Sequence, residues 1–193
     1  MHSEKVDAQD LIGATALLGG RLSEQVSITG RYDVKCLDAD GNLKWEDSIQ
    51  NLVVNVGKAN ILSVYLGAGT QTTTWYMGLV DNTGYTAYNA ADTMSSHTGW
   101  SESVAYSNST RPTVTFGTAT ASGGGAGSAG TGSIVSTAVT FTINASATIL
   151  GAFLTTGSAK SGTTGTLYSA GSFASSRAVI SGDSLLVTYT AQS

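Results

Sequence analysis

Charge is distributed very unevenly along this chain of 193 residues. Of its 22 charged side chains, 14 lie in residues 1–50 and four lie in residues 103–193: Arg111, Lys160, Arg177 and Asp183. The nearly uncharged stretch alternates apolar with small polar residues, as in Val139, Phe141 and Ile143. Such an alternation of period two is typical of β-strands with one buried face. We therefore expect a β-sheet body that follows a more polar N-terminal region.

The composition supports this reading and supplies the turns. Gly, Ser and Thr together account for 76 of the 193 residues, and there is a single Pro. Regularly spaced strands with such turns indicate a sandwich or a barrel, and we favour a mainly β, antiparallel β-sandwich of jelly-roll or Ig-like type. The expected strands cover residues 26–36, 43–49, 75–81, 111–120, 134–143, 148–155, 166–173 and 184–191.

The predicted organisation is a polar N-terminal arm over residues 1–25 and a sandwich body over residues 26–193. The arm is either a mobile tail or a segment that docks on a neighbouring subunit. One short helix is expected near residues 51–66, where NLVVNVGKANILSVYL carries a wide apolar face. Such a face predicts that most of the helix is buried, and Gly57 within it would permit close packing.

Two loops have distinctive chemistry. DADGN at residues 38–42 is typical of a hairpin turn; a calcium loop would need a Glu at its twelfth position, where this chain has Ile49. GGGAGSAGTG at residues 123–132 is expected to be a flexible loop, either a linker between strands or a tip that a partner orders.

Several classes of protein are disfavoured by the residue inventory. The net charge of −4 opposes a nucleic-acid binder, and no stretch has the roughly 18 apolar residues of a membrane span. Cys36 has no partner for a disulfide and is expected to be buried. The N-terminus lacks the apolar stretch of a signal peptide, so we expect synthesis in the cytoplasm.

The residue types of a hydrolytic triad occur in one long polar loop, residues 82–99, but we expect no catalytic, cofactor-binding or metal-binding residue. Asp92, Ser95, Ser96 and His97 crowd within six positions, whereas a triad converges from rigid elements. Hydrogen bonds that shape the loop are the expected role. The C-terminal half contributes only Asp183 toward a glycosidase pair.

Aromatic residues leave one alternative open. Trp45, Trp75 and Trp100 could stack on sugar rings, but core packing is the expected fate of tryptophan in strands. Trp100 is expected to anchor the preceding loop into the body, whereas Tyr85 and Tyr88 are candidate surface residues of that loop.

A set of segments resembles structural proteins of tailed bacteriophages and prophages. The segments are NLVVNVG (51–57), TTTWYMGLVDN (72–82), AADTMSSHTGWSE (90–102), YSNSTRPTVTFG (106–117) and FTINASATILGAFLTTGSAKSGTTGTLYSAGSF (141–173). The resemblance covers roughly residues 30–190 and excludes the first 25.

The resemblance implies a virion protein without enzymatic activity. The favoured role is capsid decoration: binding to the major capsid protein on the outer shell and stabilising it. The alternative is a tail-fibre, tail-tip or head-fibre component that contacts a host surface glycan. Either role predicts a homo-oligomer, a trimer or a dimer, located in the virion, with no nucleic-acid or membrane partner.

Overall fold

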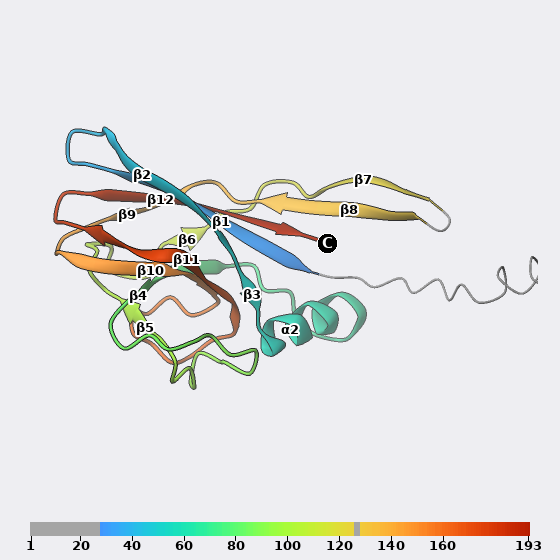
Figure 1. Ribbon diagram of the computed structural model, residues 1–193. Helices are drawn as coiled ribbons and strands as arrows, with labels where there is room; N and C mark the ends of the chain where they lie inside the picture. Colours follow the sequence, from blue (N-terminus) through green and yellow to red (C-terminus); the bar gives the residue numbers. More distant parts are fainter. Residues whose placement is uncertain (1–27, 126–127) are drawn as a thin grey trace, which may run out of the picture.

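The computed structural model describes residues 28–125 and 128–193 (Figure 1). Two antiparallel sheets pack face to face, and one helix lies at one end. The predicted mainly β, antiparallel sandwich with one helix is therefore confirmed, whereas its jelly-roll or Ig-like type stays a prediction. The predicted arm, residues 1–25, lies outside the described residues.

The first sheet contains both the first and the last described strands. Its order is β2 (Leu43–Gln50), β1 (Thr29–Leu37), β12 (Ser184–Gln192), β8 (Ser128–Val135) and β7 (Thr120–Gly125). β12 pairs with two strands along its second edge. β9 (Val139–Thr142) pairs with Ser184–Val187, and the end of β8 pairs with Thr190–Gln192. β12 thus joins the sandwich body to the β7–β8 hairpin.

The second sheet has the order β3 (Leu52–Val53), β11 (Leu167–Val179), β10 (Ala147–Thr155), β4 (Trp75–Asp81) and β5 (Ser101–Ser103). β6 (Thr113–Val114) pairs with the start of β4. The main core lies between the two sheets. Along β1, for example, Tyr32, Val34 and Cys36 point into this core and alternate with more exposed residues, as the period-two pattern predicts.

The second sheet is buried on both of its faces. A second apolar cluster lies against the face that is turned away from the first sheet, and the loop of residues 82–100 contributes to it. The cluster consists of Val54, Val80, Met94, Trp100, Leu150, Phe153, Leu167 and Ala170. Burial on both faces explains why β4 and β10 read as continuous apolar runs rather than as alternating strands.

The helix α2 (Asn55–Leu66) begins later than the predicted residue 51, because Leu52 and Val53 pair with β11 as β3. Gly57 seats against the backbone of Tyr168: a Cβ atom at Gly57 would lie 2.4 Å from the Tyr168 carbonyl oxygen. This confirms the expected close packing.

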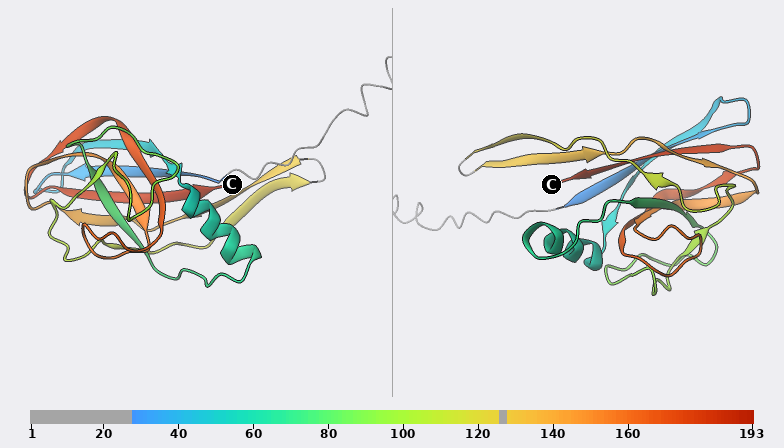
Figure 2. Two further views of the ribbon diagram at one scale, coloured as in Figure 1. Left: turned by 90° about the horizontal axis from the view of Figure 1, so that it is seen from below. Right: turned by 180° about the vertical axis from the view of Figure 1, so that it is seen from behind.

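The predicted burial of most of the helix is wrong. Only Gly57 is fully buried, whereas Leu62, Tyr65 and Leu66 are 59%, 85% and 76% exposed. The reason is geometric. The helix is held to β11 at its first turns, and its second half extends past the edge of the sandwich (Figures 1 and 2). An amphipathic pattern shows which face could be buried, not whether a partner is present.

Three other expectations need correction. Residues 111–120 are not one strand, because Thr113 and Val114 pair with β4 whereas Phe116 bridges Ser136 toward the other sheet. Residues 134–143 divide into the end of β8 and β9, since Ser136 hydrogen-bonds to the backbone of Tyr189 between them. The glycine-rich residues 123–132 are largely strand rather than loop.

Candidate interaction surfaces

The loop of residues 82–100 is shaped by hydrogen bonds within itself, as the sequence predicted. Asp92 accepts a bond from the Trp100 indole nitrogen at 3.0 Å and from the Asn89 backbone nitrogen at 2.9 Å. The His97 Nδ1 atom lies 2.9 Å from the Thr93 carbonyl oxygen, and its ring stacks on Trp100. Trp100 is buried against Phe153, which confirms its predicted role as an anchor.

These contacts account for the residue types that suggested a triad. Asp92 is bonded to Trp100 rather than to His97, and Ser95 Oγ lies 3.1 Å from the hydroxyl of Thr93. Ser96 donates its backbone N–H to the Thr93 hydroxyl at 3.0 Å. The polar side chains of the loop therefore form hydrogen bonds that stabilise the conformation of the loop.

The aromatic residues proposed for sugar stacking mostly pack inward. Trp100 is buried in the second apolar cluster, and Trp45 and Trp75 are half-buried against the main core. Tyr88 donates its hydroxyl to the Gly171 carbonyl oxygen at 3.0 Å, and half-buried Tyr85 packs on Tyr88 edge to face. Burial raises the pKa of Tyr88 well above its ordinary value. Neither tyrosine projects freely from the loop.

A buried ion pair ties β5 to the segment that follows it and to the loop of residues 156–166. Arg111 donates to both carboxylate oxygens of Glu102, at 2.9 and 2.8 Å, and to the carbonyl oxygens of Gly157 and Gly162. The same carboxylate accepts bonds from the Tyr106 hydroxyl at 3.2 Å and the Ser161 backbone nitrogen at 2.6 Å. Every charged group in this network is satisfied internally, so the network is structural in character.

The turn between β1 and β2 is held by Asp38, as the hairpin reading predicted. Its carboxylate accepts the backbone N–H groups of Asp40 and Asn42 at 2.9 and 2.8 Å, and Gly41 adopts a positive φ of 85°. The bonds from Asn42 lower the pKa of Asp38. Among the described residues, no group of three or more His, Cys, Asp or Glu side chains could hold a metal ion.

Cys36 is fully buried beneath the first sheet, as predicted. Burial, together with the nearby carboxylate of Asp183, raises the pKa of its thiol to about 11. Asp183 is itself buried and accepts a bond from Lys44 Nζ at 2.6 Å. A thiol in this setting stays protonated and unreactive at neutral pH.

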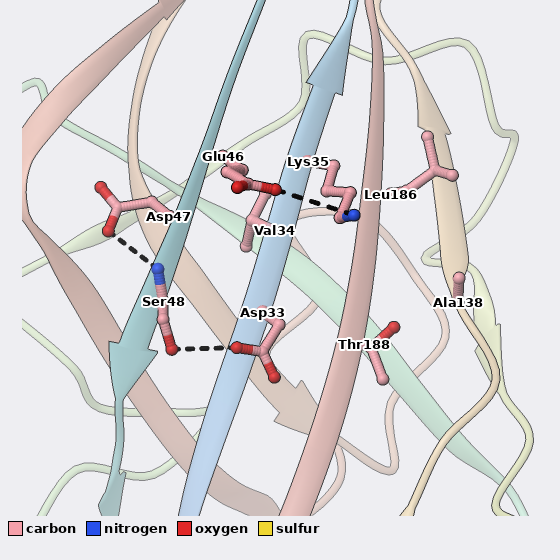
Figure 3. A pocket seen from close by; sticks show the side chains of 9 residues that line it. All are labelled: Asp33, Val34, Lys35, Glu46, Asp47, Ser48, Ala138, Leu186 and Thr188. Carbon is pink, nitrogen blue, oxygen red and sulfur yellow. Dashed lines mark hydrogen bonds and ion pairs between the residues drawn. The ribbon is translucent and has the colours of Figure 1, made fainter. Parts of the chain in front are cut away.

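A shallow groove of about 610 Å³ crosses the outward face of β2, β1 and β12 (Figure 3). Several of its polar side chains contact one another. Lys35 Nζ lies 3.7 Å from Glu46, and Ser48 donates its hydroxyl to Asp33 at 3.0 Å. Exposed pairs of this kind contribute only about 0–1 kcal/mol each. The groove is the solvated face of a sheet, and nothing in its lining selects a ligand.

An apolar cleft opens where the two sheets separate, at the end of the sandwich that carries α2. Its volume is about 200 Å³, and its lining has no charged residue. The lining residues are Trp75, Phe116, Ile134, Leu154, Tyr168, Tyr189 and Ala191. Trp75 was expected to pack in the core, whereas a cleft at this end was not predicted from the sequence.

The β7–β8 hairpin projects beyond the sandwich at this same end (Figures 1 and 2). β8 pairs with β12 only through Ser133, Ile134 and Val135. Outward from there the two strands pair with each other, from Thr120 opposite Ser133 to Gly125 opposite Ser128, and Gly132 also contacts Ser193. Residues 121–132 contain only Gly, Ala, Ser and Thr.

The projecting part of such a hairpin has few interactions that stabilise it. Two strands without a packed face are marginally stable in water, and glycine inside a strand weakens it further. Its strand edges offer backbone N–H and C=O groups that can pair with another chain. These properties make the hairpin a candidate interaction surface.

No described helix is long and apolar enough to cross a membrane. Comparison of the chain with protein-family models, with curated proteins and with solved structures returned no match.

Proposed function

We propose that this chain is a structural subunit of a tailed-bacteriophage particle, a decoration protein that binds the outer face of the capsid shell and stabilises it. The observation that carries the proposal is the projecting, uncharged β7–β8 hairpin. Its two edges are suited to pairing with strands of the major capsid protein, and pairing would supply the stability that the isolated hairpin lacks.

Other features of the described residues support this role. The most conspicuous polar side chains form hydrogen bonds that stabilise loops of the protein itself; they are Asp92, His97, Glu102 and Arg111. The body is a β-sandwich with few charges, as suits a module that is exposed on a particle. The resemblance of residues 30–190 to phage structural proteins implies a virion protein, in a capsid-decoration or a fibre role, and so supports the broader part of the proposal.

Stabilisation would follow from mass action. A ligand that binds only the assembled shell stabilises it by RT ln(1 + [L]/Kd), about 2.7 kcal/mol per site when the ligand is at 100 times its Kd. Many identical sites allow modest interfaces to act together. Because capsid sites are symmetric, we propose that the chain binds as a homo-oligomer, a trimer or a dimer.

The test uses purified capsids that lack this protein, titrated with the full chain. We expect saturable binding and a rise in the unfolding temperature of the capsid. In a shortened variant, Asn-Gly replaces residues 121–132, so that the turn joins the paired residues Thr120 and Ser133. This variant should fold but bind weakly. The control is Asp40→Lys in the β1–β2 turn, at the opposite end of the sandwich, which should bind normally.

The outcomes separate the candidate roles. Absence of binding, with an unchanged capsid unfolding temperature, would contradict decoration. Saturable binding to host cells or envelope glycans instead would favour the alternative role in a tail fibre, tail tip or head fibre. Equal binding by the shortened variant would show that the hairpin is not the attachment element.

A further inference from the structure

Two apolar surfaces are exposed at one end of the molecule: the cleft, and the second half of α2, whose first turn packs on the cleft residue Tyr168. Three residues that line the cleft, Trp75, Phe116 and Ile134, are only half-buried. On α2, Leu62, Tyr65 and Leu66 are more than half exposed. Exposed apolar surface of this kind marks a site of interaction.

The N-terminal segment enters the fold beside this cleft. Gly30 in β1 is paired with Ala191, which lines the cleft, and Thr29 is paired with Gln192. α2 and the β7–β8 hairpin lie at the same end, in all three views (Figures 1 and 2). Whatever precedes Thr29 is therefore tethered next to the cleft.

The sequence before Thr29 contains an apolar segment of matching character. Residues 11–18 read LIGATALL and have no charged side chain, like the lining of the cleft. The intervening residues 19–28 begin with Gly19 and Gly20, and ten residues can span at most about 33–36 Å. A linker of this length allows residues 11–18 to reach the cleft, which lies beside residue 30.

We propose that residues 11–18 dock into the apolar cleft of the same molecule and cover the exposed face of α2. An apolar cavity of about 150 Å³ can hold a benzene-sized group, so the 200 Å³ cleft has room for a leucine side chain such as that of Leu17 or Leu18. The short tether gives the segment an effective concentration in the millimolar range, which favours docking within one molecule over capture of a second copy. The proposal is independent of the capsid.

The first test follows backbone hydrogen exchange in the full chain. In Leu17→Asp/Leu18→Asp, exchange at residues 61–66 and at Ile134 should rise about tenfold, the factor expected for loss of one buried leucine contact. The control Ser23→Asp/Gln25→Asp adds the same charge outside the apolar segment and should leave exchange at these sites unchanged. Equal exchange in both variants would overturn the proposal.

The second test traps the contact covalently and does not depend on how the Asp variant behaves. A Leu17→Cys/Ala191→Cys chain should form a disulfide within one molecule on mild oxidation, with a yield independent of protein concentration. Leu17→Cys/Asp40→Cys, which pairs the segment with the opposite end, should not. The native Cys36 is buried and does not interfere. Disulfide-linked dimers would show that the segment of a second copy occupies the cleft. A yield no higher than in the control would show that the segment does not occupy the cleft in either way. Each of these results would overturn the proposal.

Discussion

Arg111 and Glu102 form a two-point ion pair inside the molecule, with their side chains only 1% and 5% exposed. The pair joins the segment after β5 to the loop of residues 156–166, because Arg111 also bonds to carbonyl oxygens of that loop. A charge that has been taken out of water is strongly destabilising when its partner is removed. The folded state should therefore depend on both residues together.

Removal of either partner should be costly. We expect Arg111→Met and Glu102→Gln each to lower the free energy of unfolding by about 3–5 kcal/mol, and the double variant to lose clearly less than the sum. Urea unfolding measures all three. The control is Lys35→Ala at the exposed Lys35–Glu46 pair, where a change of about 0–1 kcal/mol is expected. Additive losses would mean that the pair is not coupled.

Gly57→Ala tests the contact between α2 and β11. In an exposed helix position this change would stabilise by about 1 kcal/mol. Here the new Cβ would meet the Tyr168 carbonyl oxygen, and we expect a net destabilisation of about 1–3 kcal/mol. Thermal unfolding decides the sign. Lys58→Ala, at the exposed neighbouring position, should be close to neutral, and a stabilised Gly57→Ala variant would contradict the contact.

Asp92→Ala should loosen the loop of residues 82–100. The buried Trp100 indole would lose its acceptor, at a cost of about 1–3 kcal/mol for an unsatisfied buried donor. Near-ultraviolet circular dichroism and urea unfolding measure this effect. Ser95→Ala, an exposed change in the same loop, serves as the control. If the two variants unfold alike, the Asp92–Trp100 bond does not stabilise the fold.

High pH should destabilise the folded protein through the ionisation of buried tyrosine and cysteine side chains. Burial raises the pKa values of Tyr32, Tyr88, Tyr106 and Tyr189 above their ordinary value of 10.0, and that of Cys36 from 9.0 to about 11. The folded state therefore holds these protons more tightly than the unfolded state. Stability from this source is intact below pH 9 and falls as the pH rises past the unfolded values.

Absorbance of tyrosinate, followed with circular dichroism through an alkaline titration, checks this expectation. The buried phenols should ionise together with unfolding, in one cooperative step. Gradual ionisation with the fold intact would contradict it.

The sequence predicted the strands well wherever their apolar residues alternate with polar ones or form a continuous run. β4 matches its predicted bounds, residues 75–81, because both of its faces are covered. Tyr32, Val34 and Cys36 alternate with polar residues within the strand expected over residues 26–36, and all three are buried. These features follow from local pattern, since each residue's face is fixed by its position in the strand.

The surfaces proposed for interaction were harder to predict. Residues 123–132 lack the side chains that carry a strand pattern, so only the pairing across Gly123 and Gly130 identifies the hairpin. In the sequence, Arg111 is distinguished only as one of four charged residues in positions 103–193, and this does not predict its burial. The exposure of the second half of α2 was missed because the apolar pattern of a helix is the same whether or not another surface covers it.

The pairing of Thr29 with Gln192 places the start of β1 and the end of β12 at the end of the sandwich that carries the hairpin. The turns at residues 38–42 and 180–183 meet at the other end, where a Cβ on Gly182 would lie 3.3 Å from Ala39. A foreign peptide inserted between Asp40 and Gly41 would therefore point away from every element that we assign to attachment. An inserted peptide at that end would leave the proposed attachment surface free, whereas a tag fused after Ser193 would lie beside that surface.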